Sequence, residues 1–185
     1  MDATPALDLL VRDVARARDI RTVQALANTL GVAWRTAGDL WDRSAQRLTR
    51  RVLAAACVGL SCQPYHLLRL VDTLAPPNQA RLLDPLPPLG CHPGGLQVVL
   101  RIKEIAQADY AVADISALAR HVGLAWDTAA DLWYDRIQVF DRTVFARCIS
   151  ALGGPAALER LIIVEHIPVL RGDVTHREAG LAVPG

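Results

Sequence analysis

The chain has 185 residues, of which 52% are hydrophobic and 21% are charged, and its formal net charge is +1. This length fits one or two ordinary domains, and no run approaches the ~18 apolar residues that span a bilayer. Because Asp2, and no basic region, stands near the start, we expect no secretory signal and a soluble, cytoplasmic protein without membrane contacts. A net charge of +1 also argues against a uniformly basic nucleic-acid binder.

The first half of the chain predicts a series of helices. After a short lead-in, Leu7–Asp19 suits the first of them. In the second, Leu26 and Leu30 recur at helical spacing behind Thr22, which is a predicted N-cap. Gly31 falls where this helix must end, at a position that often needs the positive φ that glycine adopts at low cost.

The third helix is predicted from about Ala33 to Asp42. Small residues at Ala27 and Ala37 let it cross the second helix closely at a steep angle. Two short helices that meet in this way at a glycine are the signature of a helix-turn-helix. Leu48–Leu60 and Pro64–Leu74 predict a fourth and a fifth helix.

Residues 75–95 form a proline-rich linker that holds six of the eleven prolines. Prolines break helices and stiffen the path of the chain. The linker also contains four leucines, which make it too apolar for a free linker: Leu82, Leu83, Leu86 and Leu89. We therefore expect it to pack across a bundle and to hold the two halves of the chain in a fixed relation.

The second half repeats the first. Ala117–Trp133 aligns without a gap on Ala25–Trp41, 92 residues earlier, and 11 of the 17 positions are identical. Such self-similarity means that one helical unit is present twice. The predicted helices of the second copy are Leu96–Ala108, Asp114–His121, Ala125–Tyr134, Arg142–Leu152 and Pro155–Glu165. In the tail that follows, Pro168 argues against helix, and we expect the apolar Ile167–Leu170 to pack across the copies or across a dimer.

The pattern Leu26-Ala27-x-x-Leu30-Gly31-Val32-Ala33-x-x-Thr36-Ala37 resembles the helix-turn-helix of the lambda and Cro repressor class. The resemblance implies a five-helix fold in which one helix precedes the motif and two follow it. The predicted fold is therefore all-α, with two tandem five-helix lambda-repressor-like bundles. Copy one spans residues 1–74, the linker 75–95, copy two 96–165 and the C-terminal tail 166–185. Because repressors of this class usually dimerise, the resemblance also implies a homodimer.

The resemblance implies that double-stranded DNA is the partner, since residues at the start and on the outer face of the second motif helix contact base edges in that class. Arg35 is expected to bind guanine, Asp39 to accept from cytosine, and Thr36 to contact phosphate or a base edge. The arginines after the helix are expected to contact phosphates. The predicted DNA-binding residues are Trp34, Arg35, Thr36, Asp39, Arg43, Arg47, Arg50 and Arg51.

Charge distinguishes the copies. Residues 1–92 hold 11 arginines and 8 aspartates, a net charge of +3, whereas residues 93–185 have a net charge of −2. Copy two has Asp127 in place of Arg35, and Asp135 and Asp141 lie nearby. Since carboxylates repel phosphates, copy one is predicted to be the main DNA-binding copy of a bacterial transcriptional regulator or DNA-organising protein.

Two other interpretations of these surfaces stay open. The arginines are also compatible with an ordinary solvated surface. Trp34 and Trp41 are seven residues apart and repeat as Trp126 and Trp133, so each pair forms a stripe on one helix face. An exposed stripe is typical of a protein-contact surface and predicts an interaction or self-assembly module, whereas a buried stripe belongs to the core.

Other chemistry is not indicated by the sequence. No arrangement of serine, histidine or carboxylate residues resembles a catalytic constellation, so we expect no enzyme and no cofactor. Cys62 with His66, and Cys91 with His92, offer zinc-binding side chains, but their spacing matches no common zinc module. Cys57 and Cys148 have the character of small core residues. No metal site is therefore predicted.

Overall fold

The computed structural model describes residues 5–71 and 96–166. Copy one comprises β1 (Ala6–Leu9), α1 (Val11–Ala17), α2 (Val23–Leu30), α3 (Trp34–Trp41), β2 (Arg47–Thr49), α4 (Arg50–Gly59), α5 (Pro64–Leu67) and β3 (Leu68–Val71). Copy two comprises β4 (Leu96–Leu100), α6 (Ile102–Tyr110), α7 (Ile115–Val122), α8 (Trp126–Trp133), β5 (Val139–Asp141), α9 (Arg142–Ala151), the 3-10 helix η2 (Gly154–Ala157), α10 (Leu158–Leu161) and β6 (Ile162–His166). The predicted helix order is present in both copies. The proline-rich linker, the Cys91-His92 pair and the tail after His166 lie outside the described residues.

The prediction of an all-α fold is wrong in one respect, because short antiparallel strands join the helices. Within each copy the first strand pairs with the last, β1 with β3 and β4 with β6. The start of each predicted first helix and the end of each predicted fifth helix are therefore strands and not helix. In β1, Leu7 and Leu9 are buried while Asp8 between them is not, which is the period of two typical of a strand.

The backbone repeats more closely than the side chains do. Positive φ angles occur at four pairs of positions 92 residues apart: Asp19 and Ala111, Gly31 and Gly123, Arg43 and Asp135, Ser61 and Gly153. Only one of these pairs is glycine in both copies. The two copies therefore form the same turns with different residues, so the backbone conformation of the unit is repeated even where its sequence is not.

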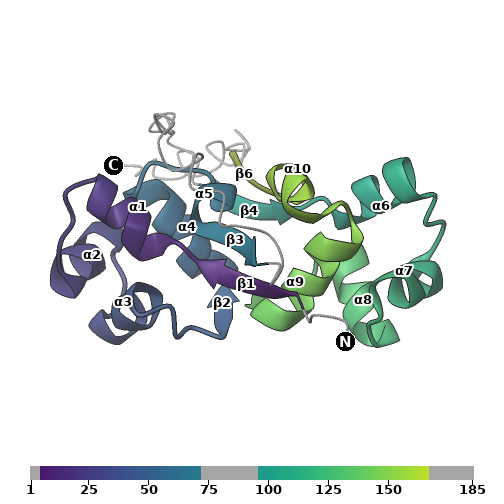
Figure 1. Cartoon of the computed structure of the whole chain (residues 1–185), viewed down its shortest axis with the longest axis horizontal. Coiled ribbons are helices and arrows are strands. Elements are labelled where there is room, and N and C mark those ends of the chain that lie inside the picture. Colours follow the sequence, from purple (N-terminus) through teal and green to yellow (C-terminus); the bar gives the residue numbers. More distant parts are fainter. Residues whose placement is uncertain (1–4, 72–95, 167–185) are drawn as a thin grey trace, which may run out of the picture.

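The two copies pair about a pseudo-two-fold axis. Strands β2 and β5 are antiparallel, and Leu48 lies opposite Phe140, its own equivalent 92 residues later. Hydrogen bonds extend the symmetry on both sides, since Arg50 N donates to Gln138 O at 3.0 Å and Arg142 N donates to Gln46 O at 3.1 Å. In Figure 1 the helix-turn-helix pairs α2–α3 and α7–α8 consequently lie at opposite ends of the long axis, with α3 and α8 both along the lower edge.

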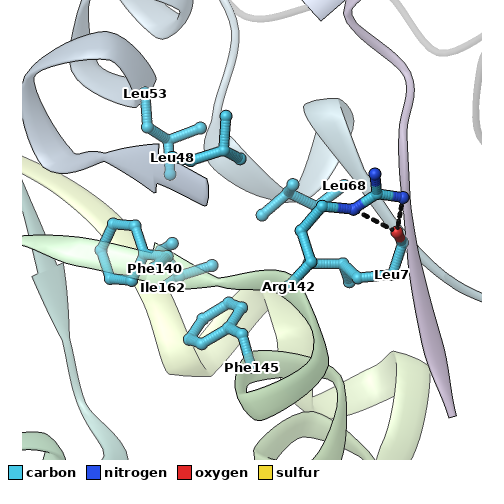
Figure 2. A pocket seen from close by; sticks show the side chains of 8 residues that line it. All are labelled: Leu7, Leu48, Leu53, Leu68, Phe140, Arg142, Phe145 and Ile162. Atoms are coloured by element: carbon cyan, nitrogen blue, oxygen red, sulfur yellow. Dashed lines mark hydrogen bonds between the residues drawn. The ribbon is translucent and has the colours of Figure 1, made fainter. Parts of the chain in front are cut away.

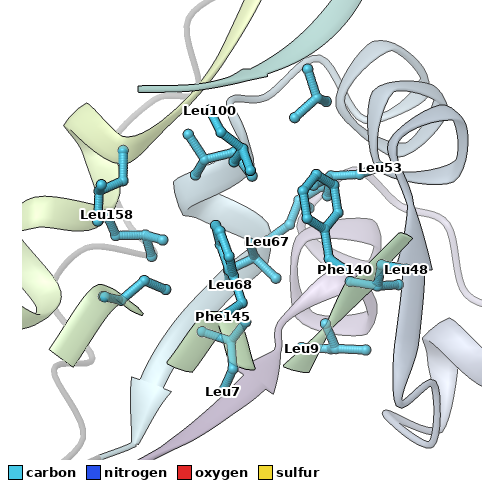
Figure 3. Packing of buried hydrophobic residues seen from close by; sticks show 14 of the residues in the cluster. Leu7, Leu9, Leu48, Leu53, Leu67, Leu68, Leu100, Phe140, Phe145 and Leu158 are labelled. Atoms are coloured by element: carbon cyan, nitrogen blue, oxygen red, sulfur yellow. The ribbon is translucent and has the colours of Figure 1, made fainter. Parts of the chain in front are cut away.

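A continuous hydrophobic core connects the copies. It runs from the helix-turn-helix of copy one, through the axis, to the helix-turn-helix of copy two. Near the axis, leucines of copy one pack against Phe140 and Phe145 of copy two (Figure 3). Among the described residues, no helix has the length and apolar character needed to cross a membrane.

Candidate nucleic-acid interface

Helix α2, the first helix of the helix-turn-helix in copy one, is stabilised locally at both of its ends. The Thr22 hydroxyl caps α2 by accepting a hydrogen bond from Ala25 N at 3.1 Å. Gly31 ends the helix with φ +63°, a left-handed conformation that glycine adopts without strain. In copy two, Asp114 caps the start of α7 and Gly123 ends it, at the equivalent positions. The turn that leads to the second motif helix thus begins with the same left-handed glycine conformation in both copies.

Helix α3 presents one buried and one exposed face. Ala37, Leu40 and Trp41 are buried against α1 and α2. The side chains predicted to contact bases lie on the other face, where Arg35 and Asp39 are exposed and Thr36 is half-buried. The helix therefore offers its predicted DNA-binding residues to solvent from a packed scaffold.

The tryptophan stripes are divided between surface and core. Trp34 is 61% exposed and Trp126 is 55% exposed, whereas Trp41 and Trp133 are only 8% and 7% exposed. The buried member is covered by cations, with Arg12 at 5.4 Å from the centroid of the Trp41 ring. The first tryptophan of each helix is therefore a surface residue, while the second belongs to the core. A contact surface that uses both members of a stripe is therefore ruled out, and only Trp34 and Trp126 remain accessible.

Three predicted phosphate or base contacts are exposed arginines: Arg35, Arg47 and Arg51. Within residues 5–71 and 96–166, no salt bridge involves any of them. Their guanidinium groups are consequently available to an anionic partner. They lie on α3, on β2 and in the first turn of α4, which are successive elements of the chain.

Arg43 has a different role from the predicted phosphate contact. Its guanidinium forms ion pairs with Asp8 at 3.0 Å and with Asp13 at 2.6 Å. Asp8 also pairs with Arg69 at 2.6 Å, so the charges form a network that ties β1, α1 and β3 to the turn after α3. A cation already held by two carboxylates is a poor phosphate ligand, and Arg43 is better described as a structural residue.

The prediction that Arg50 contacts phosphate is also wrong, because its side chain is only 15% exposed and points into copy two. It donates hydrogen bonds to the carbonyl oxygens of Val98, Asp135 and Ile137 and forms an ion pair with the Asp135 carboxylate. The equivalent Arg142 donates to the carbonyls of Leu7, Arg43 and Ala45 in copy one.

The two arginines therefore insert reciprocally across the axis. Arg142 binds the carbonyl oxygens of residues 43 and 45. Arg50 binds those of residues 135 and 137, which are the same positions 92 residues later. Neither residue was predicted to join the copies. The sequence does contain a signal, since arginine occupies both positions of the repeat although most surface charges differ between the copies.

Copy two lacks the exposed cations at the matching positions. Asp127, Val139 and Thr143 replace Arg35, Arg47 and Arg51 in order. The three are exposed, and Asp131 beside them is also exposed. Helix α8 thus has the same shape as α3 but presents a carboxylate where α3 presents a guanidinium.

The remaining chemical groups form no second site among the described residues. Burial raises the pKa of Cys148 to about 12, and the pKa of Cys57 is raised by a hydrogen bond with Cys62 and by burial. No group of three or more histidine, cysteine or carboxylate residues that could hold a metal ion occurs in the described parts of the chain. A small apolar cavity lies between the copies, with room for about one water molecule (Figure 2).

No protein-family model, curated protein or solved structure matches this chain. The resemblance to the lambda and Cro repressor class therefore depends on the motif residues of the two copies.

Proposed function

We propose that this protein binds double-stranded DNA, with copy one as its main DNA-binding unit, as a transcriptional regulator or a DNA-organising protein. The observation that carries the proposal is that Arg35, Arg47 and Arg51, on and after α3, are exposed and form no ion pair with any residue that the structure describes. They accompany Trp34 and Thr36 at the start of the second helix of a helix-turn-helix, which is the part that enters the major groove in such motifs.

Each exposed side chain has a chemical role in this proposal. The guanidinium of Arg35 matches the two acceptors of guanine, and the indole of Trp34 offers apolar contact to a thymine methyl group. Arg47 and Arg51 would neutralise phosphates, which adds affinity without sequence information. Asp39 would accept a hydrogen bond from cytosine.

The pairing of the copies also supports DNA as the partner. A two-fold relation between two recognition helices is how dimeric helix-turn-helix proteins bind two half-sites. Here a single chain carries both helices, on the same edge of the molecule (Figure 1). The homodimer expected from the resemblance remains a separate prediction.

A protein-binding module is the second candidate function. The observation that favours it is the exposure of Trp34 and Trp126, since exposed tryptophan is enriched at protein interfaces. In this alternative the two indoles, one at each end of the molecule, would hold a partner protein or a second copy of the chain.

A titration of labelled genomic fragments at two salt concentrations tests the proposal. We expect binding at low salt that weakens as salt rises, because phosphate contacts release counterions. On a preferred site, Arg35→Ala should cost about 1–3 kcal/mol and relax specificity. The matched change in copy two, Asp127→Ala, should leave affinity unchanged or raise it. Equal losses from both changes would refute copy one as the main DNA-binding unit, and no binding at low salt would leave the protein-binding module.

A further inference from the structure

The contact between the copies is made by equivalent residues of unequal size. Leu48 and Leu53 of copy one correspond to Phe140 and Phe145 of copy two under the 92-residue repeat. All four are buried and line the small cavity between the copies, and the two phenylalanine rings lie 5.5 Å apart (Figure 2). The axis is therefore filled by two small and two large side chains, one kind from each copy.

Neither copy would fill this space when paired with itself. Two units of copy one would bring four leucines to the axis, and the smaller side chains would enlarge the cavity. Two units of copy two would bring four phenylalanines into a space whose remaining cavity has room for only about one water molecule, and the excess volume would overpack it. Only the mixed pair supplies the volume that the backbone geometry leaves.

Charge also disfavours the pairing of copy one with itself. The carboxylate of Asp135 receives the guanidinium of Arg50. In a self-pair of copy one, Arg43 would stand at that position, and Arg50 would lose its anionic partner.

We propose that the two copies are specific for each other, so that the protein presents two unlike recognition surfaces about the pseudo-two-fold axis, one with the exposed Arg35, Arg47 and Arg51 and one with the exposed Asp127 and Asp131. The consequence for DNA rests on the proposed function: the DNA site that the protein recognises has one specified half-site and is not an inverted repeat. Helix α3 with Arg35 specifies the half-site. Helix α8 lies over the adjacent DNA with Asp127 in the matching place and adds no phosphate-binding arginine at positions 139 and 143.

An exchange of side chains in the full chain tests the specificity of the interface. One variant carries Leu48→Phe and Leu53→Phe, a second carries Phe140→Leu and Phe145→Leu, and a third combines all four changes. Each double variant should lower the midpoint of urea unfolding. The combined variant should regain more than half of the summed loss, because it restores two large and two small side chains. If a double variant does not fold, Leu48→Phe, Phe140→Leu and their combination form the same cycle. A combined loss equal to the sum of the two losses would overturn the inference.

Selection of binding sites from random duplexes tests the consequence for DNA. Wild-type protein should enrich a motif that occurs once per duplex. A variant with Asp127→Arg, Val139→Arg and Thr143→Arg, which gives copy two the cations of copy one, should enrich the motif twice in inverted orientation. It should bind that inverted repeat about tenfold or more tighter than wild type does. An inverted repeat selected by the wild type would overturn the inference while DNA binding stands. No enrichment at all would overturn the DNA consequence together with the proposed function, and the urea cycle would still decide the interface.

Discussion

Replacing either of two neighbouring arginines with alanine separates the interface between the copies from the proposed DNA surface. Arg50 and Arg51 are adjacent in α4, but Arg50 inserts into copy two whereas Arg51 is exposed. We expect Arg50→Ala to lower the free energy of unfolding and Arg51→Ala to leave it nearly unchanged. For DNA affinity the order should be reversed, under conditions in which both variants are folded.

The size of the Arg50→Ala effect follows from its contacts. The guanidinium donates to Val98 O and Asp135 O, each at 2.9 Å, and also to the carbonyl of Ile137 and the carboxylate of Asp135. Hydrogen bonds that involve a charged group contribute about 1.5–3 kcal/mol when considered singly, but such values do not add. The Asp135 side chain is 33% exposed, so water compensates part of the lost ion pair. Fixing the arginine side chain also costs about 2 kcal/mol of entropy, which alanine recovers. The expected net loss is about 2–4 kcal/mol.

Urea unfolding followed by circular dichroism and tryptophan fluorescence measures the free energy of unfolding. Fluorescence anisotropy with a labelled duplex over a series of salt concentrations measures DNA binding. Arg51→Ala should change stability by less than about 0.5 kcal/mol and reduce the slope of log affinity against log salt by about one. Equal stability losses from the two variants would refute the assignment of Arg50 to the interface. An unchanged salt slope for Arg51→Ala would refute its assignment to phosphate.

Three further predictions concern packing, thiol reactivity and assembly. Gly59→Ala should destabilise the fold by about 1–3 kcal/mol, because the added Cβ would lie 2.8 Å from Thr29 O and 2.7 Å from a methyl group of Leu30. As its control, Gly38→Ala should stabilise α3 by about 0.5–1 kcal/mol, since the nearest atom would be 3.9 Å away; urea unfolding of both variants checks the opposite signs. The thiols of Cys57 and Cys148 should resist iodoacetamide at pH 8 in the native protein and react in urea, because their raised pKa values suppress the reactive thiolate, and mass spectrometry that finds fast labelling of either in the native state would contradict this. Light scattering at high protein concentration should give the mass of a homodimer, and a clean monomer mass would remove the prediction of intermolecular packing.

The helix-turn-helix units were predictable because local signals agree there. Thr22 caps α2 and Gly31 ends it, as the sequence indicated. The 92-residue repeat carried the same interpretation to copy two, where Asp114 and Gly123 act at the equivalent positions. The strands were not predicted, because β1 and β3 stabilise each other through hydrogen bonds between the two ends of a copy. Helical periodicity within one segment contains no information about such a partner.

The sequence by itself determined the duplication, the order of the helices and the charge difference between Arg35 and Asp127, since each depends on residue identity and local spacing. Only the tertiary structure decided which side chains are exposed. It placed Trp34 at the surface and Trp41 in the core, although the two are a single heptad apart. It also directed Arg50 into copy two while its neighbour Arg51 stayed in solvent. The physical reason is that burial and charge pairing depend on contacts with other elements: Trp41 is buried against α1 and α2 of its own copy, and Arg50 is bound by copy two across a pseudo-two-fold axis that no local pattern specifies.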